Sequence, residues 1–406
     1  MRPLRKLWLS ALALLLIASI ALFMFKPAPE PIKVGVLHSL TGTMAESEKP
    51  LVDALQFAFE EINAKGGLLG RTVQPVVADC RSDAAVCARE AERLIADEHV
   101  SALFGCWTST CRKAVKPVVE RHKHLLFYSM QYEGMEFSPN IVYLGATPNQ
   151  QIIPAVRWAL DNLGKTFYLV GSDYVFPRTA NLIIKDLIES QGGTILGERY
   201  LPLGGKEMAS IIDDLLKVKP AVVLNTLNGE SNWAFFSAFQ RAGLSAQTMP
   251  VFSFSLAEAG LLAQSPEVAG HYAAWSYFQS LPGEDNQAFI TAFRHRFGAS
   301  RIVNYPMEFS YIAVHLWKQA VLEARSVNPD AVNHAVLRQS MRSPGGIVAI
   351  DATTRHAWKM MRIGRTRSDG LFDIVWESSR LIGPEPYPSY RTRENWERML
   401  NTGVQP

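Results

Sequence analysis

The sequence lacks the features that mark the common catalytic and nucleic-acid-binding classes. Its 406 residues carry a formal net charge of only +3 and no block of Lys or Arg, which argues against a surface for phosphate backbones. There is no Gly-x-Ser-x-Gly elbow, and the loop around Gly42 lacks the Gly-Lys-Ser/Thr of a phosphate-binding loop. No nucleophile stands with a paired base. We therefore expect no enzymatic activity, no cofactor and no nucleic-acid partner.

Charge is absent altogether from residues 8–25, which follow Arg2, Arg5 and Lys6 and precede a Pro-rich linker. A basic start and an apolar run of this kind direct export, and the positive charges hold the start inside the cell. The run is long enough to span a hydrocarbon core, and its small-x-small site, 19–21, lies inside the run. We favour a retained anchor in the inner membrane over a cleaved signal peptide. The rest of the chain is expected in the periplasm or elsewhere outside the cytoplasm.

Cysteine is scarce: the four residues are Cys80, Cys87, Cys106 and Cys111. In an exported chain disulfides are permitted, so we expect one or two bridges, with the pairing left open. The spacing resembles a zinc site only loosely and no His stands at a partner spacing, so we expect no metal site.

Hydrophobic residues make up 48% of the chain and charged residues 19%, enough for two domains with cores of their own. Short β-branched runs alternate with amphipathic stretches, which predicts parallel sheets covered by helices on both faces. A second α/β unit begins near residue 150. The predicted strands are 32–37, 73–78, 102–105, 125–127, 167–170, 194–200 and 221–226, and the predicted helices are 51–64, 84–96, 179–191, 208–218 and 231–242. Ser82 or Asp83 would cap the helix 84–96, and a further helix begins near Cys111.

The tail from Gly345 onward differs, because it contains only short strand patterns. We expect a small β extension with strands at 347–350, 360–363 and 372–376, the last two separated by turns at 365–370.

Ligands of open α/β sheets bind beyond the carboxyl ends of the strands. A neutral planar solute needs flat apolar walls, donors for its carbonyl and acceptors for its N–H groups. Aromatic and amide side chains gather at these strand ends. The alternative is that they are core residues, or, for Thr108 and Ser109, only a helix cap. The candidate walls are Trp107, Tyr128, Tyr174 and Phe176, the candidate donors are Ser109 and Gln131, and the candidate acceptor is Glu133.

The chain resembles the type I periplasmic binding proteins of the branched-chain amino-acid and amide class, and most of all the urea receptors of bacterial ABC transporters. The resemblance runs from about 32 to 388. It is carried by the segments 104–109 (FGCWTS), 112–115 (RKAV), 131–134 (QYEG), 138–140 (SPN), 148–151 (PNQQ), 171–178 (GSDYVFPR), 224–229 (LNTLNG) and 270–275 (GHYAAW).

This resemblance implies a two-lobed Venus-flytrap fold with three crossings between the lobes. The lobes would be 32–147 with 277–343, and 148–276 with 344–388, leaving 1–31 as signal or anchor and 389–406 as a tail. The ligand would be urea or a short amide, delivered to the membrane permease of an ABC transporter. Two alternatives stay open: a receptor for a branched-chain amino acid, and a tethered sensor for a signalling partner.

The pocket positions of amide-binding relatives fall here on Trp107, Ser109, Tyr128, Met130, Gln131, Tyr174 and Phe176. The chain departs from typical urea receptors at Ser129 and Met130, where those have Pro and Val, and at Cys111, where they have a small residue. Met130 would therefore reshape the pocket floor.

Overall fold

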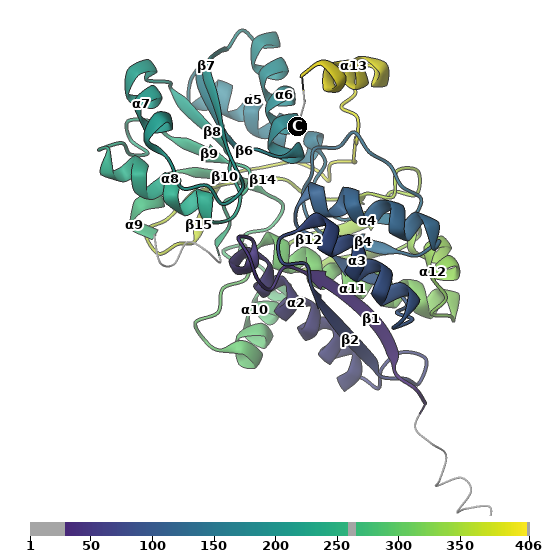
Figure 1. The fold of residues 1–406 in the computed structure, drawn as a ribbon. Helices are drawn as coiled ribbons and strands as arrows, with labels where there is room; N and C mark the ends of the chain where they lie inside the picture. Colours follow the sequence, from purple (N-terminus) through teal and green to yellow (C-terminus); the bar gives the residue numbers. More distant parts are fainter. Residues whose placement is uncertain (1–28, 259–264, 404–406) are drawn as a thin grey trace, which may run out of the picture.

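The computed structural model describes residues 29–258 and 265–403 (Figure 1). The predicted export segment or anchor, 8–25, lies outside these residues. Among the helices of the described part, none is both long and apolar enough to cross a membrane. The described chain forms two α/β lobes, each built on its own sheet, which confirms the predicted fold class.

The first lobe holds a five-stranded parallel sheet. Its elements are β1 (Ile32–His38), α2 (Ala45–Ala64), β2 (Val73–Asp79), α3 (Ala84–Ala96), β3 (Leu103–Gly105), α4 (Ser109–Arg121), β4 (Leu126–Tyr128), β5 (Ile141–Tyr143), α10 (Glu284–Phe297), α11 (Tyr305–Ala324) and α12 (Pro329–Val336). The strand order is β2-β1-β3-β4-β5. Helix α2 packs against α11 and α3 packs against α4, so helices cover both faces.

The second lobe holds a seven-stranded sheet. Its elements are η1 (Pro148–Gln150), α5 (Ile152–Asn162), β6 (Thr166–Ser172), α6 (Val175–Ser190), β7 (Thr194–Leu201), α7 (Ala209–Val218), β8 (Val222–Thr226), α8 (Glu230–Arg241), β9 (Val251–Ser253), α9 (Ser265–Val268), β10 (Tyr272–Trp275), β14 (Arg362–Thr366), β15 (Phe372–Glu377) and α13 (Arg393–Gly403). The order is β15-β14-β10-β9-β8-β6-β7. Strands β14 and β15 run antiparallel to their neighbours, so this sheet is mixed at one edge.

The predicted β extension is not a separate unit. Strands β14 and β15 complete the second sheet, while β11 (Ser340–Ser343), β12 (Gly346–Ile350) and β13 (Ala357–Trp358) form a small antiparallel sheet. The predicted strand 360–363 was placed too early and the turn at 365–370 was wrong in part, because Arg362–Thr366 is a strand that pairs with β10. Its position depends on that distant partner rather than on a local pattern.

The chain passes between the two sheets three times: after β5, after β10 and after β13. At the last passage the buried amine of Lys359 donates to the carbonyl of Leu144, which belongs to the first passage. The short sheet contacts the first lobe, since His356 forms a bridge with Tyr143 of β5. The predicted lobe boundaries remain a proposal. The segment 344–388 was predicted to belong to the second lobe, but its part that forms β12 and β13 lies beside the first lobe.

Candidate functional site

Two cavities lie between the lobes, since each is lined by side chains from both. The larger cleft cavity, about 210 Å³, is lined by Ser39, Glu48, Asp83 and Thr108 of the first lobe and by Tyr174 and Leu203 of the second. The smaller cleft cavity, about 70 Å³, is lined by Pro50, Trp107 and Asn304 of the first lobe and by Trp233, Ser255 and Leu256 of the second.

Two helix caps form part of the larger cleft cavity. Asp83 caps α3 by accepting from the backbone N–H of Val86 at 2.8 Å. Thr108 caps α4 by accepting from the N–H of Cys111 at 3.1 Å. Of the two caps predicted for each helix, the structure therefore selects Asp83 and Thr108, and Ser109 is the first residue of α4. Both helices begin at the cavity, where their first N–H groups favour a carbonyl or another acceptor.

Direct contacts join the lobes across the cleft. The indole N–H of Trp107 donates to Oδ1 of Asn228 at 3.3 Å, and Nε2 of Gln131 donates to the carbonyl of Phe254 at 3.1 Å. The lobes are therefore in a closed arrangement. In Gln131 the other amide atom, Oε1, is buried and has no hydrogen-bond partner among the described residues. It remains free to accept.

Beneath the Trp107 loop lies a buried ionic network. The guanidinium of Arg112 donates to Glu133 at 2.8 Å and to Glu136 at 2.9 Å, and it also donates to the hydroxyl of Ser109 at 2.9 Å. The Ser109 hydroxyl in turn donates to Glu133 at 2.5 Å. The amine of Lys113, partly exposed, lies 3.2 Å from Glu136 and completes the charge balance.

Charges inside this network stabilise one another. Burial alone would raise the pKa of Glu136, but the charge of Arg112 outweighs it and lowers that pKa to about 2. Burial would likewise lower the pKa of Arg112, whereas Glu133 and Glu136 raise it well above its usual value. Arg112 and Glu136 are therefore both charged at neutral pH, and the guanidinium also pairs with Glu133. None is left as an unpaired charge for a solute.

The structure brings two of the eight predicted site residues to the cleft cavities: Trp107 lines the smaller and Tyr174 the larger. The others line neither of these two cavities. The hydroxyl of Tyr128 donates to the carbonyl of Trp107 at 2.9 Å, so it supports the loop that carries the indole. The remaining members are Ser109 and Glu133, which pair with each other, Gln131, which bonds across the cleft, and Met130 and Phe176, which are buried.

Several lining residues were not predicted. Glu48 stands in the first turns of α2, ahead of the predicted helix 51–64; its carboxylate accepts from the N–H of Ser39 at 3.0 Å and contacts Nδ1 of His38 at 2.8 Å. Leu203 stands three residues beyond the predicted strand 194–200, where no site residue was predicted, and Asn304 follows no predicted strand. Asp83 was predicted as a possible cap of the helix 84–96, but not as a residue of the solute site.

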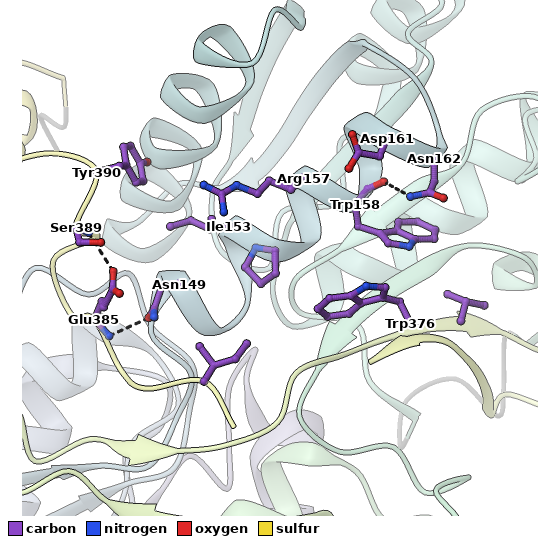
Figure 2. Close-up of a pocket in the computed structure, with 13 residues that line it drawn as sticks. Asn149, Ile153, Arg157, Trp158, Asp161, Asn162, Trp376, Glu385, Ser389 and Tyr390 are labelled. Atoms are coloured by element: carbon purple, nitrogen blue, oxygen red, sulfur yellow. Dashed lines mark hydrogen bonds between the residues drawn. The ribbon is translucent and has the colours of Figure 1, made fainter. Parts of the chain in front are cut away.

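A cavity larger than both cleft cavities lies elsewhere, on the second lobe between α5, β15 and the segment 382–390 (Figure 2). It measures about 810 Å³, and Trp158, Trp376 and Tyr390 are among the residues that line it. It shares no lining residue with the cleft cavities. All of its lining residues belong to the second lobe, so closure of the two lobes does not enclose it, and we do not assign the solute site to this cavity.

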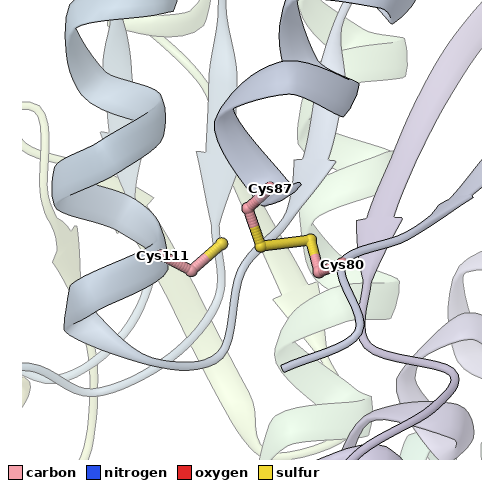
Figure 3. A group of neighbouring side chains, drawn as sticks. All are labelled: Cys80, Cys87 and Cys111. Carbon is pink, nitrogen blue, oxygen red and sulfur yellow. A yellow bond between two sulfur atoms is a disulfide. The ribbon is translucent and has the colours of Figure 1, made fainter. Parts of the chain in front are cut away.

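The four cysteines form two disulfides, Cys80–Cys87 and Cys106–Cys111, which gives the pairing that the sequence left open. Three of the sulfur atoms, those of Cys80, Cys87 and Cys111, lie within 4.8 Å of one another (Figure 3). As disulfides these sulfurs are not thiolate ligands for a metal ion.

A family model described as "Periplasmic binding protein domain" matches residues 32–393. The chain belongs to this family. The periplasmic character of the family supports the predicted location outside the cytoplasm. Among curated proteins, the "Leu/Ile/Val-binding protein homolog 7" of Brucella abortus is 37% identical over 94 residues, which is 23% of this chain and 23% of that protein. A "Limonene hydroxylase" of Geobacillus stearothermophilus is 31% identical over 122 residues, 30% of this chain and 22% of that protein. The aligned segments thus span under a quarter of these relatives.

Solved structures agree on the fold of this periplasmic binding protein. The solute binding protein of an ABC transporter from Rhodopseudomonas palustris BisB5, in complex with 3,4-dihydroxybenzoic acid, superposes with a TM-score of 0.81 at 21% identity, covering 87% of this chain and 99% of that one. A leucine binding protein from Thermotoga maritima gives 0.76 at 18% identity, covering 85% and 98%. At such identities the likeness concerns the fold.

Proposed function

We propose that the chain is an extracytoplasmic receptor that binds urea or a short amide in the cleft and presents it to the membrane permease of an ABC transporter. The observation that carries the solute class is the charge of the cleft. Among the described residues that line the two cleft cavities there is no Lys or Arg, whereas Glu48 and Asp83 line the larger one.

A carboxylate solute would meet these two carboxylates without a cationic side chain to offset them. The one deeply buried guanidinium nearby, that of Arg112, is already matched by Glu133 and Glu136. A neutral amide meets neither problem, since its N–H groups suit carboxylate and carbonyl acceptors, and its carbonyl suits the N–H groups at the starts of α3 and α4.

Cavity size supports the same class. The larger cleft cavity, at about 210 Å³, is below the roughly 300–1,000 Å³ typical of sites for drug-sized ligands. The mechanism that we propose is closure: a solute that contacts both lobes favours the closed form by its higher affinity for that form. Trp107 and Asn228, which already join the lobes, are part of this closed surface.

A branched-chain amino-acid receptor is the second candidate, because the Brucella protein with 37% identity over part of its length has that printed name. Thermal unfolding of the purified chain, followed with low-millimolar urea, formamide, acetamide, leucine or 3,4-dihydroxybenzoate, separates the classes. A solute at 100 times its Kd stabilises the folded state by about 2.7 kcal/mol. We expect the amides or urea to raise the midpoint. A rise with leucine or the aromatic acid alone contradicts the proposal.

An enzyme is the remaining class, since one partial relative is named as a hydroxylase. Incubating the chain with urea and acetamide and measuring ammonia tests for hydrolysis of these solutes. We expect binding without ammonia release. Ammonia formed at a rate proportional to protein concentration would show an amidohydrolase instead.

A further inference from the structure

The two disulfides close the same kind of junction at neighbouring places in the first lobe. Cys80 directly follows β2, and Cys87 lies in the first turns of α3. Cys106 directly follows β3, and Cys111 lies in the first turn of α4. Each bridge therefore ties the end of a strand to the start of the next helix. The strands β2 and β3 flank β1, and α3 packs against α4, so the two junctions lie side by side.

Each ring encloses residues of the proposed solute site. The ring closed by Cys80–Cys87 contains the cap Asp83, and the ring closed by Cys106–Cys111 contains Trp107 and Thr108. All three line the cleft cavities. Within so short a ring a loop has few conformations to lose when a solute binds, which preserves affinity.

The enclosed backbone needs this support, because parts of it adopt conformations that L-residues disfavour. Arg81 has φ 54°, Ser82 has φ 57° and Cys106 has φ 63°. Such residues persist only where surrounding structure holds them. Opening either ring releases a junction that would relax towards negative φ, and the neighbouring cavity residues would move with it.

The two bridges also contact one another. The sulfur atoms of Cys80, Cys87 and Cys111 lie within 4.8 Å of each other, and Figure 3 shows the Cys111 sulfur beside the Cys80–Cys87 bond. Cys87 and Cys111 both line the larger cleft cavity. A thiol that enters the open cleft therefore has a route to either bridge, and a closed lobe covers that route.

We propose that the two disulfides are positioning groups for the solute and form one exchange-coupled unit, so that reduction of one bridge opens both rings and weakens solute binding. The solute half of this inference rests on the proposed function; the exchange half does not.

The chemistry needs one dithiol reductant. A thiolate of the dithiol attacks the Cys80–Cys87 bond, and its second thiol resolves the mixed disulfide, leaving two cysteine thiols and an oxidised, cyclic dithiol. The freed Cys87 thiolate then attacks the sulfur of Cys111, and Cys106 leaves as a thiolate. This second step moves no net electrons. The product has a Cys87–Cys111 bond between α3 and α4, with Cys80 and Cys106 free.

The test uses the purified full chain in its oxidised form. It is treated with one equivalent of dithiothreitol, free thiols are alkylated, and the remaining disulfide is mapped by peptide mass spectrometry. We expect a Cys87–Cys111 peptide pair. Recovery of only the original pairs overturns the exchange.

Binding is measured by calorimetry with urea and acetamide before and after full reduction, and on Cys80→Ser/Cys87→Ser and Cys106→Ser/Cys111→Ser variants. We expect Kd to rise about tenfold or more in each case, with the unfolding midpoint recorded to ensure that folded protein is titrated. Saturating solute should also slow reduction of the oxidised chain, because linkage is reciprocal. An equal Kd in oxidised and reduced protein overturns the positioning role. If the oxidised chain binds neither solute, the proposed function fails, and the peptide map still decides the exchange.

Discussion

The indole nitrogen of Trp107 lies 3.3 Å from Oδ1 of Asn228, so this side-chain hydrogen bond joins the two lobes beside the smaller cleft cavity. The side-chain amide of Asn228 also donates to the carbonyl of Thr226. Its backbone N–H donates to the hydroxyl of Ser172 at 2.9 Å. The acceptor is therefore held in place by its own lobe before the lobes close.

Asn228→Ala is expected to weaken solute binding by about 1 kcal/mol, or about fivefold in Kd, because the closed form loses one hydrogen bond. Isothermal titration with the best solute measures this. Asn162→Ala is the matched control, since Asn162 is exposed and bonds only within α5. An unchanged Kd for Asn228→Ala would show that this bond does not contribute to closure.

Gly204→Ala is expected to hold the lobes apart. A Cβ at Gly204 would lie 2.3 Å from Oγ1 of Thr43 in the other lobe, so Thr43 or the loop of Gly204 would have to move before the lobes could close fully. Since Gly204 has φ +81°, part of any effect is local strain, and Gly192→Ala, at φ +74° with nothing within 4 Å, controls for that part. Small-angle scattering with solute should show a larger radius of gyration for Gly204→Ala than for Gly192→Ala. Equal radii would contradict the expectation.

Arg112→Met is expected to lower the free energy of unfolding by about 3–5 kcal/mol, because it leaves the carboxylates of Glu133 and Glu136 buried without the guanidinium between them. Guanidinium titration is the appropriate measurement, since urea is a candidate solute. Lys113→Met should cost under about 1 kcal/mol, because its amine is partly exposed. A loss for Arg112→Met no larger than that for Lys113→Met would mean that the network is not a stabilising unit.

Ser109→Ala tests whether the Ser109 hydroxyl stabilises the buried ionic network or binds the solute. The Ser109 hydroxyl is shared between Arg112 and Glu133, so its removal should lower stability by about 1 kcal/mol while changing Kd little. Gln131→Leu should instead raise Kd about fivefold, because it removes the hydrogen bond to the carbonyl of Phe254 that joins the closed lobes. Should Ser109→Ala raise Kd more than Gln131→Leu, the solute contacts the network itself.

His271 is expected to make the protein acid-sensitive. Burial lowers its pKa to about 3 from an ordinary 6.5, and Nδ1 accepts from the N–H of Val251 at 2.9 Å. Below about pH 6.5 the unfolded chain therefore binds a proton at His271, whereas the folded chain does not. The stability that comes from burying the neutral imidazole is fully present above pH 6.5 and is lost as the pH falls towards 3. The difference in unfolding free energy between wild type and His271→Gln should shrink by about 1.4 kcal/mol per pH unit below 6.5. A difference in unfolding free energy that does not change with pH would show that His271 binds its proton as readily in the folded chain as in the unfolded one.

Local patterns were enough to predict most of the fold. Helix α3, 84–96, was predicted with the bounds that the structure has, because an amphipathic repeat and an N-terminal cap are local signals. The start of α2 was missed, since Glu46 and Glu48 stand in its first turn and Pro50 follows inside the helix, where a proline is usually disfavoured.

The candidate site was predicted less completely, because strand ends locate a cleft but not the direction of each side chain. Trp107 and Tyr174 lie at the cavities as expected. Ser109 and Glu133 stand 24 residues apart, and no periodicity indicates that they bond to each other rather than to a solute. Glu48 lines the larger cavity from a helix, and a prediction based on strand ends does not find such a residue.

The placement of β14 and β15 has a consequence for how the protein is made. The second sheet is completed only by Arg362–Thr366 and Phe372–Glu377, whereas its first strand, β6, begins at Thr166. During synthesis some two hundred residues therefore emerge between the first and the last strand of one sheet. Until they do, β10 has an unpaired edge able to pair with other chains. A holding chaperone that delays pairing during export is thus more useful to this chain than to one whose domains finish in sequence order.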